Sequence, residues 1–583
     1  MLHTLTRSLR ENKGPALVTV LLSALEVVFE IVIPLFMSNL IDFGIEGGSM
    51  AAVWKFGAFL LLLAAFQLAT GVLAARIAAR ASVGFAANLR EDMFDNVQTF
   101  AFSNIDKFST ASIVTRLTTD TTNVQNAFQM LMRMAIRAPV MLIFSMIVSF
   151  RISHDISMTF LIILPILALA LFFIIRSVFP VFSRVFRTYD ELNNVVQENV
   201  RGIRVVKSFN QERHEIGKFG AISERIYKDF SKGERLITLN APLMQFCIYT
   251  CMIVISWLGA KAIIASGNDP ALGLTTGNLT ALITYTMQIL SSLMMLSMVF
   301  AMLTISLSSA RRIAEVLEEQ SDIPQPEQPV MTVRDGAVDF DHVSFVYASK
   351  ADKKVLDDID LHIRSGETIG IIGGTGASKS SLVQLIPRLY DVTGGKLTLG
   401  GVDVRDYDLD TLRGAVAMVL QKNELFSGTI AENLRWGNEN ATDEQLRHAC
   451  KLACADGFIS AMPDGYDTHI EQGGTNVSGG QKQRLCIARA LLKKPKVLIL
   501  DDSTSAVDTR TDAQIQQALS TYIPDTTKII IAQRISSVQN ADRIVVLDDG
   551  HIDAVGCHDE LLRTCEIYRE VYESQQKGGE DDA

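Results

Sequence analysis

The stretch Ile369–Leu382, which reads IGIIGGTGASKSSL, decides the fold of this chain of 583 residues. Its apolar start is typical of a β-strand and its end is typical of a helix. The loop between them fits the phosphate-binding pattern G-x-x-x-x-G-K-[S/T], except that Ser378 stands where the pattern has glycine. Backbone N–H groups of such a loop point at phosphate oxygens. The candidate nucleotide-binding residues here are Gly373, Gly374, Thr375, Gly376, Ala377, Ser378, Lys379, Ser380 and Ser381.

Two side chains of this loop and one distant carboxylate have expected roles. Lys379 would reach the β- and γ-phosphates of the nucleotide, and the Ser380 hydroxyl would bind Mg²⁺. The apolar run Val497–Leu500 is followed directly by Asp501, the carboxylate expected as the second Mg²⁺ ligand. The sequence therefore predicts a site for ATP and Mg²⁺.

The surrounding sequence predicts an α/β domain over residues 337–573. Short β-branched runs such as Ala337–Phe345 and Thr368–Ile372 alternate with helical stretches. That alternation is typical of a partly parallel sheet. A polar, proline-rich segment, Gln320–Pro329, lies within the expected linker 318–336, and the charged tail 574–583 is expected to be disordered.

The N-terminal part, residues 1–317, predicts an all-α membrane domain. A membrane helix needs about 20 mostly apolar residues, and Ala271–Ala310 has no charged residue at all. The first span contains Glu26 and Glu30, and the uncharged part of the third is short. We expect six spans, at about 16–40, 55–76, 130–150, 156–176, 236–264 and 279–305.

Loop charge indicates the orientation in the cell membrane. Arg176–Arg235 is rich in Lys and Arg and Arg76–Arg137 carries several, whereas the short connections have almost none. Positive residues mark the cytoplasmic side, so we expect both termini, both long loops and the nucleotide-binding domain to be cytoplasmic. The helical patterns of the long loops predict that the spans continue as helices beyond the bilayer. The net charge of −10 and the lack of a basic tract give no indication of nucleic-acid binding.

A further motif carries a family resemblance. Ser478-Gly479-Gly480-Gln481 lies between the loop and Asp501, and it resembles the signature sequence of the ABC transporter family. Four other residues match motifs of that family in the same order: Tyr347 the aromatic residue that stacks on adenine, Gln421 the Q-loop glutamine that contacts metal and water, Glu471 the X-loop acid of exporters, and Asp508 the D-loop.

The membrane part resembles ABC exporters with six spans per chain. Thr115–Asp120 and Gly202–Phe209 are similar to intracellular-loop sequences of that family, which dock on the nucleotide domains. A solvated helical face is the alternative for individual residues there. The resemblance implies a half-transporter that acts with a second one among membrane lipids.

Two further residues, in separate motifs, depart from the family pattern. Active ABC sites have glutamate where this chain has Asp502, and histidine where it has Gln533. The aspartate carboxylate falls short by about 1.5 Å, and a misplacement of that order can reduce the rate ~10²-fold. A neutral amide can neither take up a proton nor place a cation near the γ-phosphate.

With Ser378, these departures resemble the degenerate-site subunit of a heterodimeric exporter. The chain's own motifs would form a weakly hydrolytic ATP site, and its intact signature would complete the site of a different partner. A homodimer with slow ATPase activity is the first alternative. The second is a nucleotide-gated regulatory or channel subunit.

The exported compound is given only by the resemblance, which implies small amphipathic or hydrophobic compounds, multidrug or lipid-like. Glu26 and Glu30 lie one helical turn apart in the first span. Ionisable groups in a membrane helix usually face a water-filled cavity. A substrate cavity for cations, a proton pathway and a structural bond to a neighbouring span all remain open for this pair.

Overall fold

The computed structural model describes residues 1–269, 273–347, 354–503 and 506–580, and it divides into two compact units. The first comprises Met1–Gln98 and Thr110–Glu319. The second comprises Thr99–Ser109 and Gln320–Ala583. In this division the short segment Thr99–Ser109, from the membrane half of the sequence, belongs with the second unit.

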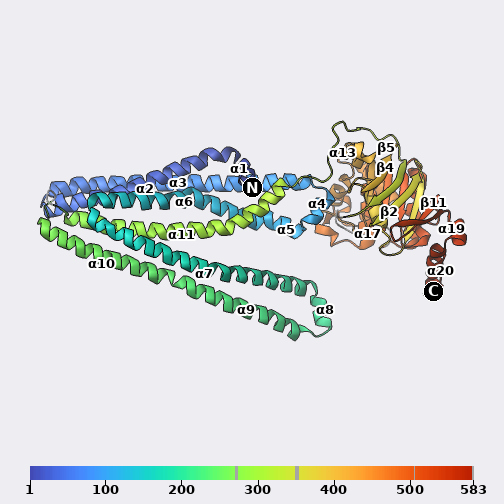
Figure 1. Ribbon diagram of the computed structural model, residues 1–583. Helices are drawn as coiled ribbons and strands as arrows, with labels where there is room; N and C mark the ends of the chain where they lie inside the picture. Colours follow the sequence, from blue (N-terminus) through green and yellow to red (C-terminus); the bar gives the residue numbers. More distant parts are fainter. Residues whose placement is uncertain (270–272, 348–353, 504–505, 581–583) are drawn as a thin grey trace. The chain divides into compact units, whose positions relative to one another are not determined.

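The first unit is all helical, and its long helices run side by side (Figure 1). Within the described residues, six helical stretches are long and apolar enough to cross a membrane, which confirms the predicted number of spans. The long helices are α2 (Lys13–Asn39), α3 (Met50–Gln98), α6 (Thr121–Ile152), α7 (His154–Arg201), α9 (Glu212–Thr238), α10 (Asn240–Ser266) and α11 (Thr276–Glu318). Shorter helical segments are α1 (Leu2–Arg7), η1 (Arg10–Asn12), η2 (Leu40–Glu46), α5 (Thr110–Thr115), η3 (Arg116–Asp120) and α8 (Ile203–Ser208).

The long helices extend well past a bilayer, as predicted. Helix α3 has 49 residues, and at 1.5 Å per residue this is about 74 Å, more than twice the ~30 Å hydrocarbon core. Ala74, Ala78 and Ala81 are fully buried along one side of α3. Such small residues let neighbouring helices approach closely. Near the start of the predicted fifth span, 236–264, α9 ends at Thr238 and α10 starts at Asn240.

The second unit is an α/β domain, as predicted. A six-stranded sheet has the order β12-β11-β3-β10-β9-β6, and all its pairs are parallel except that of β12 with β11. A four-stranded antiparallel sheet has the order β2-β1-β4-β5, and β7 pairs with β8. The strands are β1 (Val338–Phe345), β2 (Leu356–Ile363), β3 (Thr368–Gly373), β4 (Gly394–Leu399), β5 (Val402–Asp403), β6 (Val416–Val419), β7 (Gly428–Thr429), β8 (His469–Ile470), β9 (Val497–Asp501), β10 (Thr527–Ile531), β11 (Arg543–Asp548) and β12 (His551–Gly556).

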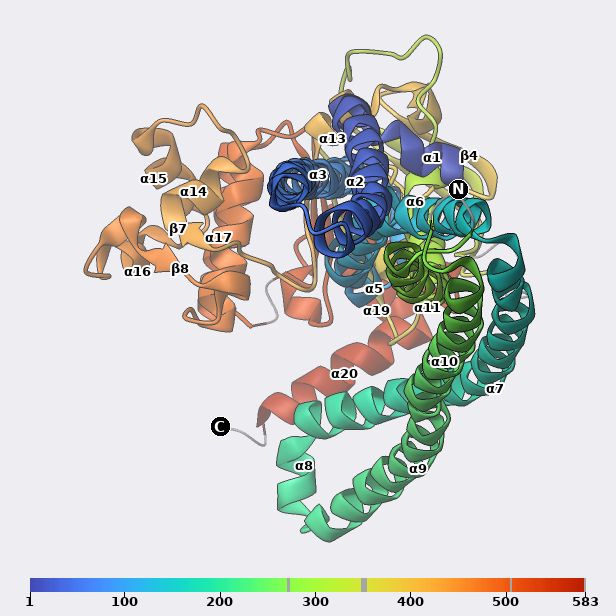
Figure 2. The ribbon, with the colours of Figure 1, turned by 90° about the vertical axis from the view of Figure 1, so that its left-hand side faces the viewer.

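Both faces of the six-stranded sheet are buried, one of them in an apolar cluster that also includes β1, β2 and β4 of the four-stranded sheet. Ile371, Ile499 and Ile531 belong to one buried apolar cluster, and Ile372 and Leu500 belong to another. Burial on both faces explains why these strands read as continuous apolar runs. The helices of the unit are α4 (Phe102–Lys107), α12 (Lys379–Gln384), α13 (Leu409–Ala415), α14 (Ile430–Arg435), α15 (Asp443–Leu452), α16 (Asp456–Ser460), α17 (Gly479–Leu492), α18 (Thr509–Tyr522), α19 (His558–Thr564) and α20 (Glu566–Glu580). Figure 2 shows α14–α17 gathered with β7 and β8 in one lobe.

The predicted disordered tail 574–583 is wrong for its described part, since α20 continues as a helix to Glu580. The reason lies at the start of this helix. Tyr568 is fully buried, and Val571 and Tyr572 pack against the same apolar cluster. The anchored first turns supply the nucleus from which a polar helical end can propagate.

Three strands deliver candidate site residues to one edge of the sheet. Neighbouring strands β3, β10 and β9 run parallel. The glycine-rich loop follows β3, Gln533 follows β10 by two residues, and Asp501 ends β9. Open α/β sheets bind ligands outside the carboxyl ends of their strands, so the topology places these residues where a ligand site is expected.

Candidate nucleotide site

The glycine-rich loop is closed by its own lysine. The ammonium of Lys379 donates hydrogen bonds of 2.8 Å to the carbonyl oxygens of Gly373 and Gly374. A Cβ on Gly373 would lie 2.2 Å from the carbonyl oxygen of Leu547, so only glycine fits there. Burial lowers the pKa of Lys379, although Asp501 and Asp502 oppose this effect. The loop therefore has the backbone path and the cation that phosphate binding requires.

Ser378 sits in the loop's most demanding position. Its φ of 66° and ψ of 21° put it in the left-handed region, immediately before α12. A residue with a Cβ pays about 1–2 kcal/mol to adopt this conformation, whereas glycine does not. The loop thus accommodates serine at the motif's glycine position with a left-handed backbone.

Asp501 and Ser380 lie together at the end of β9. The Asp501 side chain is only 3% exposed and accepts a hydrogen bond from the Ser380 hydroxyl. Burial raises the pKa of Asp501 above its usual range. A buried carboxylate beside a hydroxyl is a hard oxygen donor set of the kind Mg²⁺ prefers. The residues present therefore fit the predicted Mg²⁺ site.

The two departures from the family pattern are bonded to each other. The Gln533 side-chain amide donates to Oδ2 of Asp502 at 2.8 Å. The Gln421 side chain forms a second hydrogen bond with the Asp502 carboxylate. Burial raises the pKa of Asp502, and both amides act in the opposite direction. The Asp502 carboxylate, which the sequence predicts to fall short of the attacking water, is bonded to two neutral amides.

Tyr347 lies beside the glycine-rich loop. Its hydroxyl is 2.7 Å from the Ser381 hydroxyl, and its ring is 43% exposed. The ring makes an edge-on contact with Tyr390, at 5.1 Å between centroids. An exposed ring next to the phosphate loop suits stacking on a base. The sequence did not point to Tyr390, because nothing in it distinguishes this residue from the other tyrosines of the chain.

The signature residues form the start of a helix. The Ser478 hydroxyl accepts a bond from the Gln481 N–H at 3.3 Å, and the Gln481 side chain accepts one from the Ser478 N–H at 2.9 Å. This reciprocal arrangement is a capping box. A Cβ on Gly480 would lie 2.8 Å from the carbonyl oxygen of Ala506, whereas Gly479 has more room.

Two further predicted residues, Asp508 and Glu471, form hydrogen bonds with residues close to them in the sequence. Asp508 accepts a bond from the Thr511 N–H at 2.9 Å as the cap of α18, and this backbone bond lowers its pKa. Glu471 accepts a bond from the Thr475 hydroxyl at 2.8 Å. The structure thus brings together the loop, Asp501, Asp502, Gln421 and Gln533, while these two residues and the signature bond within their own segments.

Comparison with known proteins decides the family. The profile of the ABC transporter transmembrane region matches residues 16–309, and the ABC transporter profile matches residues 356–505. The uncharacterized ABC transporter ATP-binding protein YfiB of Bacillus subtilis is 35% identical over 558 residues, covering 96% of each chain. The chain belongs to the ABC transporter family. Another relative, the uncharacterized ABC transporter ATP-binding protein Rv1273c of Mycobacterium tuberculosis, is 33% identical over 580 residues and covers 99% of this chain and 98% of its own.

The fold of this ABC transporter is that of an exporter. A bacterial Atm1-family ABC exporter with ATP bound superposes with a TM-score of 0.83, covering 97% of this chain and 99% of its own, at 24% identity. The chain is therefore a multi-pass membrane protein with an ATP-binding domain of the exporter type, and exporters of this type act as dimers.

The two glutamates of the first ABC transporter span have a structural partner. Arg137 of α6 donates to Oε1 of Glu26 at 2.7 Å and to Oε2 of Glu30 at 2.6 Å. The Gln288 amide of α11 also reaches the carbonyl oxygen of Glu30, at 3.2 Å. The sequence left three roles open for Glu26 and Glu30. The structure shows one of them, a bond to a neighbouring span. One guanidinium faces two carboxylates, which leaves one formal negative charge in excess.

The predicted intracellular-loop motif Thr115–Asp120 bonds within the membrane unit. Arg116 pairs with Glu315 at 3.1 Å, and Arg312 pairs with Asp120. The segment that lies with the nucleotide-binding domain is the preceding one, Thr99–Ser109.

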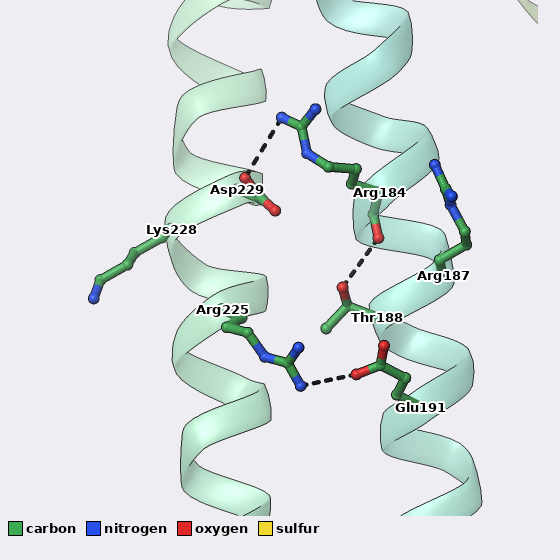
Figure 3. A pocket seen from close by; sticks show the side chains of 7 residues that line it. All are labelled: Arg184, Arg187, Thr188, Glu191, Arg225, Lys228 and Asp229. Atoms are coloured by element: carbon green, nitrogen blue, oxygen red, sulfur yellow. Dashed lines mark hydrogen bonds and ion pairs between the residues drawn. The ribbon is translucent and has the colours of Figure 1, made fainter.

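A charged cleft of about 460 Å³ lies between α7 and α9. Figure 3 shows its lining side chains, of which Arg225 and Glu191 pair at 2.8 Å across the two helices. Arg184 and Asp229 lie 3.8 Å apart in a second, longer pair. The other lining residues are Arg187, Thr188 and Lys228. Both ion pairs join α7 to α9, so the charged residues that line this cleft hold the two helices together.

Proposed function

We propose that this chain is the degenerate-site half of a heterodimeric ATP-driven exporter. Its own loop binds ATP but hydrolyses it poorly, and its signature completes the competent site of a different partner chain. The observation that carries the proposal is the hydrogen bond between Gln533 and Asp502, since both residues replace the groups that activate water in the family pattern.

The geometry around Asp502 supports weak hydrolysis. An effective general base must lie within hydrogen-bond reach of the proton it abstracts. The Asp502 carboxylate accepts hydrogen bonds from Gln533 and Gln421, and these bonds stabilise its present orientation. Its side chain is one methylene shorter than glutamate, and Gln533 carries no proton that it can lose or gain near pH 7. The site is therefore equipped to hold nucleotide more than to cleave it.

The nucleotide-binding groups themselves are complete. Lys379 would exchange its two backbone carbonyl partners for phosphate oxygens, and Tyr347 would stack on adenine. Ser380, Asp501 and Gln421 would hold Mg²⁺, which supplies charge neutralisation at the β- and γ-phosphates when bound. ATP binding at this site would still bring two nucleotide domains together.

The intact signature supports an active site shared with a partner. Ser478 and Gln481 bond to one another and leave the two glycines at the surface of the helix start. Head-to-tail pairing in the family puts this surface, with Asp508 nearby, against the partner's nucleotide. The partner would then contribute a glutamate and a histidine at the positions of Asp502 and Gln533.

For the membrane part, we propose export of small amphipathic or hydrophobic compounds, multidrug or lipid-like. Both termini and the nucleotide-binding domain would face the cytoplasm. A substrate cavity lined by Glu26 and Glu30 would favour cationic over anionic amphiphiles, because one Arg137 guanidinium serves two carboxylates.

Subunit mixing tests the proposal. The full chain is coexpressed with the candidate partner and ATPase activity is measured in nanodiscs. We expect Glu→Gln in the partner to abolish turnover and Asp502→Asn in this chain to leave most of it; the reverse pattern would assign the competent site to this chain.

Two further measurements address the alternatives. Substantial ATPase activity of this chain purified alone would support the slow homodimer. Solute movement down its gradient without hydrolysis, in vesicles containing both subunits, would support the gated channel.

A further inference from the structure

A side-chain amide from the C-terminal helix is bonded to the loop that carries Gln533. The Gln575 side chain donates to the carbonyl oxygen of Gln533 at 2.7 Å and accepts from the N–H of Ile535 at 2.9 Å. A primary amide presents its donor and its acceptor side by side, as a peptide group does. Gln575 therefore binds two backbone groups on either side of Arg534.

The position of Gln575 in α20 follows from the helical repeat. Tyr568, Val571, Tyr572 and Gln575 have the spacing i, i+3, i+4, i+7, which places them on one face of the helix. The first three pack against the apolar cluster. The fourth is exposed and bonds to the loop. An apolar stripe that ends in a hydrogen-bonding amide thus aims Gln575 at this segment.

The bonded loop is connected to the nucleotide site through a short chain of bonds. Beyond Gln533, Ile535 is buried, and the Ser537 hydroxyl donates to Asp512 at 2.6 Å. Before it, β10 ends at Ile531, beside Asp501 of β9. The Gln533 side chain lies between these anchored points and donates to Asp502.

We propose that Gln575 is a positioning residue of this ATP site: it fixes the Gln533 loop so that the Gln533 side chain stays bonded to Asp502. The inference deepens the proposed function, because it concerns the same site. Held by Gln533 and Gln421, the Asp502 carboxylate keeps a defined orientation. When the loop is released, Asp502 loses one of its two amide donors, and its negative charge is less compensated beside bound phosphate. Like charges repel, so nucleotide should leave faster.

The test measures nucleotide release from the full-length chain in nanodiscs, with a fluorescent trinitrophenyl-ATP probe and competing ATP. We expect Gln575→Ala to accelerate release about threefold to tenfold, the range a lost hydrogen bond of ~1 kcal/mol covers. Alanine favours helix, so α20 should be retained. Gln576→Ala is the matched control, since the Gln576 amide bonds to Tyr572 within α20, and it should leave release unchanged.

A double-mutant cycle separates positioning from general destabilisation. If Gln575 acts through Gln533, then Gln575→Ala should have no further effect in a Gln533→Ala background. Equal effects in both backgrounds, or release unchanged in Gln575→Ala, would overturn the inference. Hydrogen exchange at the Ile535 N–H gives an independent readout and should accelerate in Gln575→Ala alone.

These outcomes are independent of whether the proposed function holds. Probe release reports on this chain's own site in either a homodimer or a heterodimer. A slow homodimeric ATPase would refute the degenerate-subunit proposal while the cycle still measured coupling between Gln575 and Gln533.

Discussion

The hydroxyl of Tyr390 donates a hydrogen bond of 3.0 Å to the Asp106 carboxylate of α4. The Phe102 ring of α4 lies against the same tyrosine, at 6.0 Å between centroids. Tyr390 in turn contacts Tyr347, the candidate adenine-stacking residue. A short helix from the membrane half of the sequence is thereby linked through Tyr390 to Tyr347.

Removing the Tyr390 hydroxyl should loosen α4 without disturbing the ring contacts. A hydrogen bond to a charged group contributes about 1.5–3 kcal/mol, so Tyr390→Phe should make local opening of α4 at least tenfold more frequent. Hydrogen exchange at the Phe108 N–H, which is bonded to the Asn104 carbonyl, measures this opening. Tyr407→Phe is the control, because the Tyr407 hydroxyl bonds to Leu399 and lies away from α4 in the chain. Unchanged exchange in Tyr390→Phe would contradict the expected role.

Replacing Ser378 by glycine should tighten ATP binding or raise the thermal stability of the chain. The left-handed backbone of Ser378 costs about 1–2 kcal/mol that glycine avoids, so Ser378→Gly should lower the Kd for ATP or raise thermal stability correspondingly. Thr375→Gly, at a residue without positive φ, should bring no such gain. The measurement is equilibrium binding of ATP together with thermal unfolding of the purified chain. If Ser378→Gly weakened ATP binding and also lowered the thermal stability, the strain argument would be contradicted.

Restoring the family residues should restore hydrolysis only when both are changed. Asp502→Glu with Gln533→His should raise turnover at this chain's own site on the order of 10²-fold, the range associated with a positioned general base. Each single change leaves a mismatched partner, because Asp502 and Gln533 are bonded to each other. Steady-state ATPase measurements check this, and Lys379→Ala in the double variant should remove the gain. Equal gains from the single variants would argue against the coupling.

Asp501 should make stability depend on pH in a defined direction. Burial raises its pKa, so the folded state binds this proton more tightly than the unfolded chain does. The stabilisation is present below the ordinary value of about 3.8 and is lost as the pH rises through the raised pKa. Asp501→Asn should therefore raise the apparent melting temperature of the nucleotide-free protein at pH 7.5, and less so at pH 5. Thermal unfolding at both pH values provides the check, and a lower melting temperature at pH 7.5 would contradict it.

The group formed by Glu26, Glu30 and Arg137 should tolerate the loss of one carboxylate better than the loss of its guanidinium. Glu26→Gln leaves Arg137 paired with Glu30, whereas Arg137→Met leaves two carboxylates without their cation. Breaking a buried pair in this way costs about 3–5 kcal/mol. Thermal stability in nanodiscs should fall in the order wild type, Glu26→Gln, Arg137→Met. A variant Arg137→Met as stable as Glu26→Gln would show that the charges are solvated.

The nucleotide site was predictable because its signals are local. The strand before Gly373 and the acid after Leu500 can each be recognised from a stretch of about ten residues. The parallel strands then bring both to one edge of the sheet. Arg137 was not predicted as the partner of Glu26, since the two are 111 residues apart in sequence and the pairing depends on helix packing. The tail was misjudged for another reason: its charged composition masks the stripe of Tyr568, Val571 and Tyr572, whose burial the sequence alone does not show.

The uninterrupted course of α3 has a mechanical consequence. Glycines can mark hinges in a helix, but Gly71 and Gly84 have packing roles, as an added Cβ would lie 3.3 Å from the Glu26 carboxylate and 2.5 Å from the Asn12 side chain. Only Gly57, where an added Cβ would meet nothing within 4 Å, lies in open space within this helix. A displacement at the Gln98 end should therefore pass as translation or tilt through the packed part of α3, and bending is expected no nearer than Gly57.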